Sequence, residues 1–383
     1  MFVSALVAAI LVRSEYSALG EPEIVFQKTV LDTRFIAEGV AVGDVDRDGA
    51  LDVIAGNVWY KAPQWSVHEI APVVTVDPRQ AYSACFHTWA VDLNHDGWTD
   101  QLMIGMPGEK VVWRENSKGK PGPWKEHPVW HSACNESPLF EDLLGSGKRV
   151  LVMGTEDDTV SWFEPSTNPT DEWIRHDVSA HKGAGSQRYS HGLGVGDLNG
   201  DGRKDIVTKD GYYAAPKNRR KGSWRFVKAG LGPECAQMLT WDVDSDNRTD
   251  VLSTSAHGRG VWWFSRAASG QFEEHVIDET VSETHSACLA KLGKPRTLNL
   301  ITGKRKWAHP PGVDVGSEEP SWLVRYELVP SAAGVTWERH VIDEESGVGT
   351  QFVVQDIDRD GLQDIVVSNK NGVFVFKQMR QKA

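Results

Sequence analysis

A strand-rich unit of about 50 residues repeats seven times along this 383-residue chain, and the repeat constrains the fold more than any other feature. Most units open on an acidic loop, and successive loop positions start 48, 50, 55, 45, 49 and 65 residues apart, the last interval holding an insertion at 304–321. Such a period holds four short strands with their turns, which is one propeller blade. Five units close on Trp/Phe-x-x-His-x-Ile/Val: Trp65–Ile70, Trp124–Val129, Trp173–Val178, Phe272–Ile277 and Trp337–Ile342.

The two ends of the chain complement each other. The last unit stops at Val373–Phe376 without a closing strand, whereas Phe26–Asp32 aligns with the closing segment Phe272–Asp278. The N-terminal segment therefore supplies the missing strand of the last blade, and this closes a ring. The sequence predicts an all-β, seven-bladed β-propeller over residues 23–383.

Five units carry an acidic loop of one spacing, Asp-x-Asp/Asn-x-Asp-Gly/Asn-x-x-Asp. Its polar positions are Asp44, Asp46, Asp48 and Asp52; Asp92, Asn94, Asp96 and Asp100; Asp197, Asn199, Asp201 and Asp205; Asp242, Asp244, Asp246 and Asp250; and Asp356, Asp358, Asp360 and Asp364. Alternating oxygen ligands around a glycine are typical of the first half of a calcium loop, so we expect Ca²⁺ at these positions. The alternative is that these side chains only hold a tight turn by bonding their own backbone amides.

Composition narrows the class of protein and its compartment. The formal net charge is -12, which makes nucleic acid an unsuitable partner. Residues 1–22 include the short apolar stretch Phe2–Val12, which is typical of a signal peptide and too short to span a membrane. We therefore expect a secreted or periplasmic protein without a membrane span. The pairs Cys85 with Cys134 and Cys235 with Cys288 suit either disulfides or buried thiols.

Histidines that recur with the repeat have a structural explanation. His68, His127, His176, His275 and His340 occupy one position of the closing strand. A residue that repeats with the blade usually serves packing or a hydrogen bond to the neighbouring blade. These five are therefore not candidates for the site.

The residues that differ from blade to blade are more informative. The start of each first strand, which lines the central channel, carries a polar side chain in all seven units: Glu38, His87, Glu136, His191, Gln237, His285 and Gln351. The turns after the second strands lie at the same mouth, because antiparallel strands run back, and they add cations, aromatics and His257 and His309. One asymmetric, sugar-sized polar site is the prediction.

This set of side chains suits two kinds of chemistry. His87, Glu136, His191 and His285 could hold Zn²⁺ or another divalent metal in the channel with one position open. The same groups could serve as a metal-free acid and base. A third interpretation is that they satisfy one another through channel water.

Two resemblances extend these expectations. The acidic repeat is similar to the FG-GAP or VCBS repeat of secreted propellers and covers nearly the whole chain after residue 22. The segments 191–194, 235–238, 256–263 and 303–309 resemble bacterial single-propeller relatives of aldos-2-ulose dehydratase. That resemblance implies removal of water from keto-sugars such as 1,5-anhydrofructose and glucosone, with zinc and with divalent ions in the loops.

Elimination beside a ketone needs a base, an electrophile for the enolate and an acid for the departing oxygen. The residues assigned to catalysis by position are His191, His257, His285, His309, Lys304 and Arg305. Those assigned to substrate binding are Tyr212, Asp210, Gln237, Gln351, Trp307 and Lys370.

The predicted function is thus a secreted carbohydrate-active carbon-oxygen lyase or dehydratase. It acts on a small keto-sugar or oxidised glycoside by metal-assisted elimination. The alternatives are a non-catalytic propeller that binds carbohydrate or protein, and a lyase of uronic-acid polysaccharides.

Overall fold

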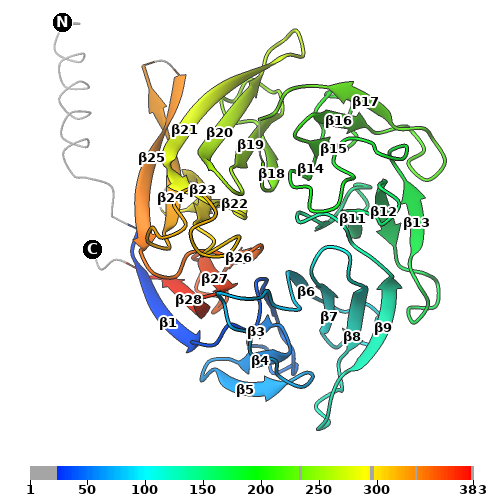
Figure 1. The fold of residues 1–383 in the computed structure, drawn as a ribbon, viewed down its shortest axis with the longest axis vertical. Coiled ribbons are helices and arrows are strands. Elements are labelled where there is room, and N and C mark those ends of the chain that lie inside the picture. Colours follow the sequence, from blue (N-terminus) through cyan, green and yellow to red (C-terminus); the bar gives the residue numbers. More distant parts are fainter. Residues whose placement is uncertain (1–23, 233–234, 294–296, 333, 381–383) are drawn as a thin grey trace, which may run out of the picture.

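The structure, a computed structural model, describes residues 24–380 except 233–234, 294–296 and 333. Every regular element in these ranges is a β-strand, and the strands form seven four-stranded antiparallel sheets. Figure 1 shows the sheets arranged as blades around a common centre. The predicted seven-bladed β-propeller is confirmed. The predicted signal peptide at 1–22 lies outside the described residues.

The strands of the first four blades, from the axis outward, have the following bounds. Blade one holds β2 (Ala41–Gly43), β3 (Asp52–Ala55), β4 (Val58–Lys61) and β5 (Ser66–Glu69). Blade two holds β6 (His87–Val91), β7 (Asp100–Ile104), β8 (Val111–Glu115) and β9 (Lys125–Trp130). Blade three holds β10 (Leu139–Glu141), β11 (Val150–Gly154), β12 (Val160–Glu164) and β13 (Ile174–Asp177). Blade four holds β14 (Gly194–Gly196), β15 (Asp205–Thr208), β16 (Gly211–Ala214) and β17 (Arg225–Lys228).

The last three blades follow the same order. Blade five holds β18 (Met238–Trp241), β19 (Asp250–Thr254), β20 (Arg259–Arg266) and β21 (Phe272–Ser282). Blade six holds β22 (Ala287–Leu292), β23 (Thr297–Gly303), β24 (Leu323–Ser331) and β25 (Gly334–Asp343). Blade seven holds β26 (Phe352–Gln355), β27 (Asp364–Asn369), β28 (Gly372–Gln378) and β1 (Phe26–Asp32).

Strand β1 closes the ring as expected. It pairs antiparallel with β28, with Phe26 opposite Gln378 and Val30 opposite Phe374. The ammonium of Lys28 also lies 2.9 Å from Asp343, which ends the outer strand of blade six. The N-terminal strand thus joins the last blade to its neighbour.

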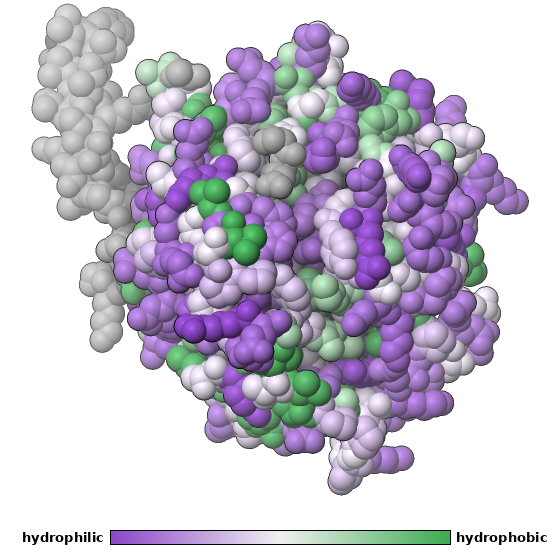
Figure 2. Space-filling model, viewed as in Figure 1, coloured by the Kyte–Doolittle hydropathy of each residue, from purple (hydrophilic) through white to green (hydrophobic). Residues whose placement is uncertain are grey.

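The hydrophobic core lies between neighbouring blades. One cluster, for example, packs Leu102 and Trp113 of blade two against Leu151 and Phe163 of blade three. The middle strands are buried on both faces because each blade has a neighbour on either side, and β7 and β11 are buried throughout. The face shown in Figure 2 is mostly hydrophilic, with hydrophobic residues in small separate patches.

The repeated histidines pack as expected, but their partners are in the same blade. Four of them stack on the tryptophan directly opposite on the third strand: Trp59 with His68, Trp113 with His127, Trp162 with His176, and Trp263 with His275, with centroids 4.0–4.4 Å apart. The fifth, His340, lies opposite Arg325 and 3.6 Å from Glu327. These residues are structural.

Two smaller predictions can be compared with the described residues. Cys85, Cys134 and Cys288 are free thiols, and the thiol of Cys235 donates to the carbonyl of Leu231 at 3.0 Å. Neither disulfide is formed in this structure. In the described ranges no helix is long and apolar enough to cross a membrane.

Candidate functional site

Three histidines converge where successive blades meet at one mouth of the ring. His191 precedes β14, His257 lies in the turn between β19 and β20, and His285 precedes β22. One ring nitrogen of each lies within 4.8 Å of the others. The three rings meet edge to face, with centroids 4.9–5.3 Å apart. We call these residues the histidine centre.

One nitrogen of each ring in this centre makes no hydrogen bond among the described residues, although Asp314 lies 3.7 Å from Nδ1 of His257. Nε2 of His191, Nδ1 of His257 and Nε2 of His285 are buried and have no hydrogen bond within the described part of the chain. Burial lowers the pKa of His257 to about 4 and holds the pKa of His285 well below its usual value. These two imidazoles are therefore neutral at pH 7, which is the form that binds metal.

A carboxylate and a guanidinium adjoin the centre. Oε2 of Glu136 lies 3.4 Å from Nε2 of His191, without hydrogen-bond alignment, and 3.6 Å from Nη1 of Arg305. Burial by itself would raise the pKa of Glu136, but His191 and Arg305 hold it at about 2. The buried Arg305 also donates from Nε to Oε2 of Glu38 at 2.7 Å. On this side of the centre Glu136 is therefore an ionised carboxylate next to the charged Arg305, and Glu136 has no proton to donate at pH 7.

A histidine–aspartate pair stands on the other side. His309 stacks on His257 with centroids 4.4 Å apart, and Nδ1 of His309 lies 2.9 Å from Oδ1 of Asp314. A carboxylate only accepts hydrogen bonds, so Nδ1 of the neutral ring carries the hydrogen and Nε2 keeps a lone pair. The side chain of His309 is 46% exposed, whereas that of Asp314 is 8% exposed. His309 is the accessible imidazole of the site.

The structure changes the expected membership of the site. His257, expected as an acid or base, joins His191 and His285, whereas His87 is outside the cluster of ligand atoms. His87 is fully buried, and neither ring nitrogen has a hydrogen-bond partner among the described residues. Glu136 contacts the centre but is not one of the three clustered ligands.

Lys304 does not have the expected position. Its side chain is completely buried and its ammonium pairs with Glu283, whose other oxygen accepts the amide of Ala308 at 2.9 Å. It therefore cannot stabilise an enolate in the open part of the site. Lys304 instead fixes the start of the 304–309 segment that carries His309. Arg305 is buried as well, and its guanidinium holds Glu38 and Glu136.

Most residues expected to bind substrate have other contacts. Tyr212 is buried in the core between blades and cannot stack on a sugar. Asp210 is exposed and paired with Lys209 at 3.0 Å. Gln237 accepts the amide of Ala287 at 3.2 Å, and Gln351 makes two bonds to the backbone of Thr88.

Trp307 and Lys370 lie close together but are covered. The ammonium of Lys370 donates to the carbonyl of Trp307 at 2.7 Å and lies 4.5 Å from the ring centroid of Tyr82. Burial lowers the pKa of Lys370 to about 8. The indole of Trp307 lies 5.3 Å from the guanidinium of Arg79 and is 7% exposed. Lys370 therefore holds the 304–309 segment through the backbone of Trp307.

Sequence reasoning missed Asp314, Glu283 and Tyr82. Asp314 belongs to the insertion at 304–321, which has no counterpart in other blades, so the repeat gave no signal for it. Glu283 has a positive φ of 51° just before His285. Its role as the partner of Lys304 depends on a turn that spacing does not reveal.

The acidic loops lie at the opposite ends of the first strands. In three loops the carboxylates of the first, third and fifth positions lie within 4.8 Å of one another. The three groups are Asp44, Asp46 and Asp48; Asp242, Asp244 and Asp246; and Asp356, Asp358 and Asp360. The first aspartate also accepts the amide of the sixth residue, as Asp44 does from Gly49 at 3.1 Å. Gly49 has φ of 92°, a conformation that explains glycine at this position. The turn and an ion site are compatible, and calcium remains a prediction.

The ninth-position aspartates connect the loop to the sheet. Oδ2 of Asp52 accepts the amide of Val45 and Oδ1 accepts that of Ala62, both at 2.9 Å. Corresponding bonds form at Asp100, Asp205, Asp250 and Asp364. Burial, with added repulsion from the loop carboxylates, raises the pKa of Asp52 to about 6 and of Asp100 to about 7. Each oxygen of Asp52 accepts one such bond and keeps a further lone pair, so a cation ligand at this position also remains a prediction.

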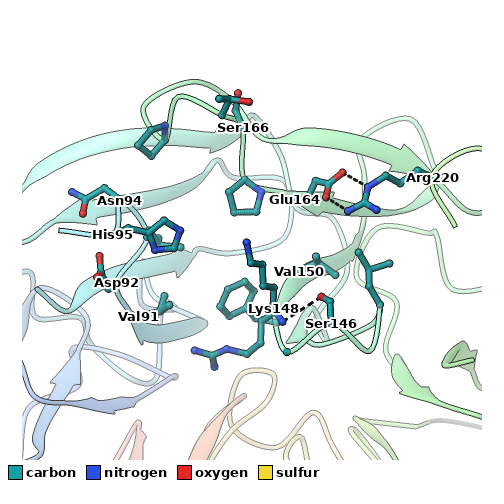
Figure 3. Close-up of a pocket in the computed structure, with 18 residues that line it drawn as sticks. Val91, Asp92, Asn94, His95, Ser146, Lys148, Val150, Glu164, Ser166 and Arg220 are labelled. Carbon is teal, nitrogen blue, oxygen red and sulfur yellow. Dashed lines mark hydrogen bonds and ion pairs between the residues drawn. The ribbon is translucent and has the colours of Figure 1, made fainter. Parts of the chain in front are cut away.

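A surface pocket of about 660 Å³ lies between blades two and three, beside the acidic loop of blade two. Figure 3 shows Asn94 and His95 on one side of it, Lys148 at its centre, and Glu164 paired with Arg220 on the other side. The Glu164–Arg220 contact is 2.6 Å. None of the residues of the histidine centre lines this pocket.

Comparisons with known proteins support the fold. No protein-family profile and no curated protein matches the chain. The crystal structure of BBS1N in complex with ARL6DN, soaked with lead, superposes with a TM-score of 0.55 at 10% identity, over 95% of this chain and 99% of that one. The rhamnogalacturonan lyase YesW gives a TM-score of 0.47 at 14% identity over 94% and 74% of the two chains. An Agrocybe aegerita protein that recognises non-reducing terminal N-acetylglucosamine gives 0.45 at 16% identity over 84% and 81%. At these identities the likeness concerns the fold alone.

Proposed function

We propose that this propeller is a carbohydrate-active carbon-oxygen lyase whose histidine centre holds a divalent transition metal. The observation that carries the proposal is the convergence of His191, His257 and His285. One ring nitrogen of each lies within 4.8 Å of the others, is buried and makes no hydrogen bond in the described part of the chain. Three protein nitrogens and one open position form a common arrangement of a catalytic zinc site.

The donor set fits such an ion. Buried polar groups without a partner are rare, because each costs about 1–3 kcal/mol. Three unpartnered nitrogens at one point therefore indicate a bound group. Bound there, the metal would supply a Lewis acid beside the ketone of the substrate.

His309 is the base in this proposal. Asp314 fixes the tautomer in which Nε2 is free, and exposure leaves this nitrogen accessible to substrate. Nε2 takes the proton from the carbon next to the ketone. The electrons of that C–H bond form the C=C bond, the C–O bond of the leaving group breaks, and the same proton on His309 passes to the departing oxygen. The products are an unsaturated ketone and water, or an alcohol when the leaving group is a sugar.

The remaining charged groups orient the centre. Glu136 is held as a carboxylate by His191 and Arg305 and places a negative charge beside His191. Lys304 and Glu283 anchor the segment that carries His309. These are positioning roles, because none of the four side chains faces the open side of the site.

The substrate class follows from this chemistry. A ketone beside a C–H bond with an oxygen leaving group describes a keto-sugar or an oxidised glycoside. The segments around His191, His257 and His309, which resemble relatives of aldos-2-ulose dehydratase, support the same class.

The test follows the ultraviolet absorbance of the enone product. The zinc-loaded protein is incubated with 1,5-anhydrofructose and with glucosone. We expect His309→Gln to lower the rate by about 10²–10⁴-fold, which is the usual contribution of a general base. Asp314→Asn should shift the pH–rate profile while it leaves metal content unchanged. His68→Ala is the matched control, because His68 lies in an outer strand and contacts Trp59 and Ser66 of its own blade.

Two results would reject the proposal. The first is no enone from either sugar with fully loaded protein. The second is equal turnover in the wild type and in His309→Gln. Equal losses in His309→Gln and His68→Ala would show that the assay reports folding rather than chemistry, and would also count against a base at position 309.

A further inference from the structure

The central channel contains a second cavity, apart from the histidine centre. It has a volume of about 610 Å³ and is lined by residues of six first strands and by the adjoining Arg149 and Gln237. Cavities that bind small molecules commonly measure about 300–1,000 Å³. We call it the axial cavity.

Hydrogen bonds across the ring close its inner end. Gln351 bonds twice to the backbone of Thr88, at 2.7 and 2.9 Å, and Nε2 of Gln237 donates to the carbonyl of Thr350 at 3.5 Å. The hydroxyl of Thr350 donates in turn to the carbonyl of Phe86. None of the three residues of the histidine centre lines the axial cavity, so the cavity does not depend on the proposed reaction.

The wall of the axial cavity is mainly apolar. Trp89, Leu139, Val195, Leu239, Leu289 and Val353 line it and are only partly buried. Trp241 is 40% exposed. Each apolar side chain covered by a ligand contributes about 25 cal/mol for every Å² removed from water. The channel is therefore suited to an apolar molecular body rather than to a sugar.

One cation, Arg149, lines the cavity, and a second, Lys291, is not part of the lining but lies next to the lining residue Trp241. The guanidinium of Arg149 lies 4.6 Å from the ring centroid of Phe140, and the ammonium of Lys291 lies 5.4 Å from that of Trp241. Neither makes an ion pair within 4 Å in the described ranges. One carboxylate, Glu141, also lines the cavity, next to Asp142. Aromatic surface next to unpaired cations favours a ligand with an acidic group.

We propose that the axial cavity binds an amphiphilic small molecule with an aromatic or branched aliphatic body and one acidic group. The body packs against Trp89, Leu239 and Leu289, and the acid lies beside Arg149. Arg149 makes no ion pair within 4 Å in the described ranges and adjoins the aromatic wall at Phe140, which favours an acid over an amine. This binding is independent of the metal and of the reaction at the opposite mouth.

The probe is 8-anilinonaphthalene-1-sulfonate, an aromatic body with one acid. We expect one equivalent to bind the native protein, as measured by fluorescence titration and by calorimetry. Leu239→Trp fills the cavity and should weaken binding at least tenfold. Arg149→Gln should weaken it about tenfold, because a hydrogen bond to a charged group contributes about 1.5–3 kcal/mol. The neutral N-phenyl-1-naphthylamine should bind at least fivefold more weakly than the sulfonate.

Three controls locate the probe. Arg149 and Phe140 also line the surface pocket of Figure 3, whereas Leu239 lines only the axial cavity and Lys148 only that pocket. Lys148→Gln should therefore leave binding unchanged. The variant with alanine at 191, 257 and 285 should also bind normally. Near-ultraviolet circular dichroism must match the wild type for each variant, and Val195→Trp replaces Leu239→Trp if that variant misfolds.

Unchanged affinity in both Leu239→Trp and Val195→Trp would overturn the proposal. A loss in Lys148→Gln as large as in Leu239→Trp would place the probe in the surface pocket and overturn it too. Equal affinity for the neutral and the acidic probe would refute the claim that the ligand carries an acidic group.

Discussion

Replacing Lys304 by methionine tests whether this residue serves the structure rather than the reaction. The Lys304 and Glu283 side chains are both 0% exposed and paired, and Glu283 also accepts the amide of Ala308. Removal of one partner from a buried ion pair leaves an uncompensated charge and costs about 3–5 kcal/mol.

The expected size of the effect can be converted to a melting temperature. Unfolding entropy is about 2.1 cal/mol/K per residue, or about 0.75 kcal/mol/K for a propeller of about 360 residues. Lys304→Met should therefore lower Tm by about 4–7 °C. The double variant Lys304→Met/Glu283→Gln should recover at least half of this loss, because the amide oxygen can still accept from Ala308. Lys306→Met, a neighbouring change at a partly exposed lysine, should cost less than about 1 kcal/mol.

Thermal and urea unfolding measured by circular dichroism give these values, and metal content is measured on the same samples. A fall in Tm below about 1 °C for Lys304→Met would refute the buried pair. Loss of bound metal without loss of stability would show that Lys304 reaches the histidine centre after all.

Three further predictions concern the acidic loops, the buried His87 of the channel, and the close contact of Gly349 with Glu38. Calcium added to chelator-treated protein should raise Tm more at pH 8 than at pH 5, because Asp100 has a folded-state pKa of about 7 and is protonated at the lower pH. No rise in Tm at either pH would contradict calcium binding in the loops. Burial lowers the pKa of His87 to about 3, whereas a histidine in the unfolded chain has a pKa near 6.5. As the pH falls from 6.5 to 4, this group should lower the free energy of unfolding of the metal-free protein by about 1.4 kcal/mol per pH unit, and urea titrations of His87→Gln should lack that contribution. Gly349→Ala would place Cβ 1.9 Å from the carbonyl oxygen of Glu38 and should cost about 2 kcal/mol or more, whereas Gly230→Ala meets no atom within 4 Å and should be neutral.

The fold was predictable because every blade repeats the same local pattern. The acidic loops and the closing strands recur about once every 50 residues, so each unit supports the assignment independently. The pairing of β1 with β28 followed from the alignment of Phe26–Asp32 alone. The Trp–His pairs lie within a blade rather than between blades because the two residues are directly opposite on neighbouring strands.

The site was predictable only where it depends on the repeat. His191 and His285 precede the first strands of blades four and six, and the repeat spacing placed both at one mouth of the ring. Tyr212 was misplaced because β16 has a neighbouring blade on both sides, so that Tyr212 and Tyr213 both enter cores. Asp314 and the burial of Lys304 depend on an insertion found in one blade only, and a single sequence carries no pattern for it.

Metal content tests the central claim most directly. Protein purified without chelators is analysed by mass spectrometry as wild type, as the triple alanine variant at 191, 257 and 285, and as His87→Ala. Our account predicts about one equivalent of zinc or another transition metal in the wild type and in His87→Ala, and none in the triple variant. Equal transition-metal content in wild type and triple variant, or none in any of the three after zinc is supplied, would contradict it.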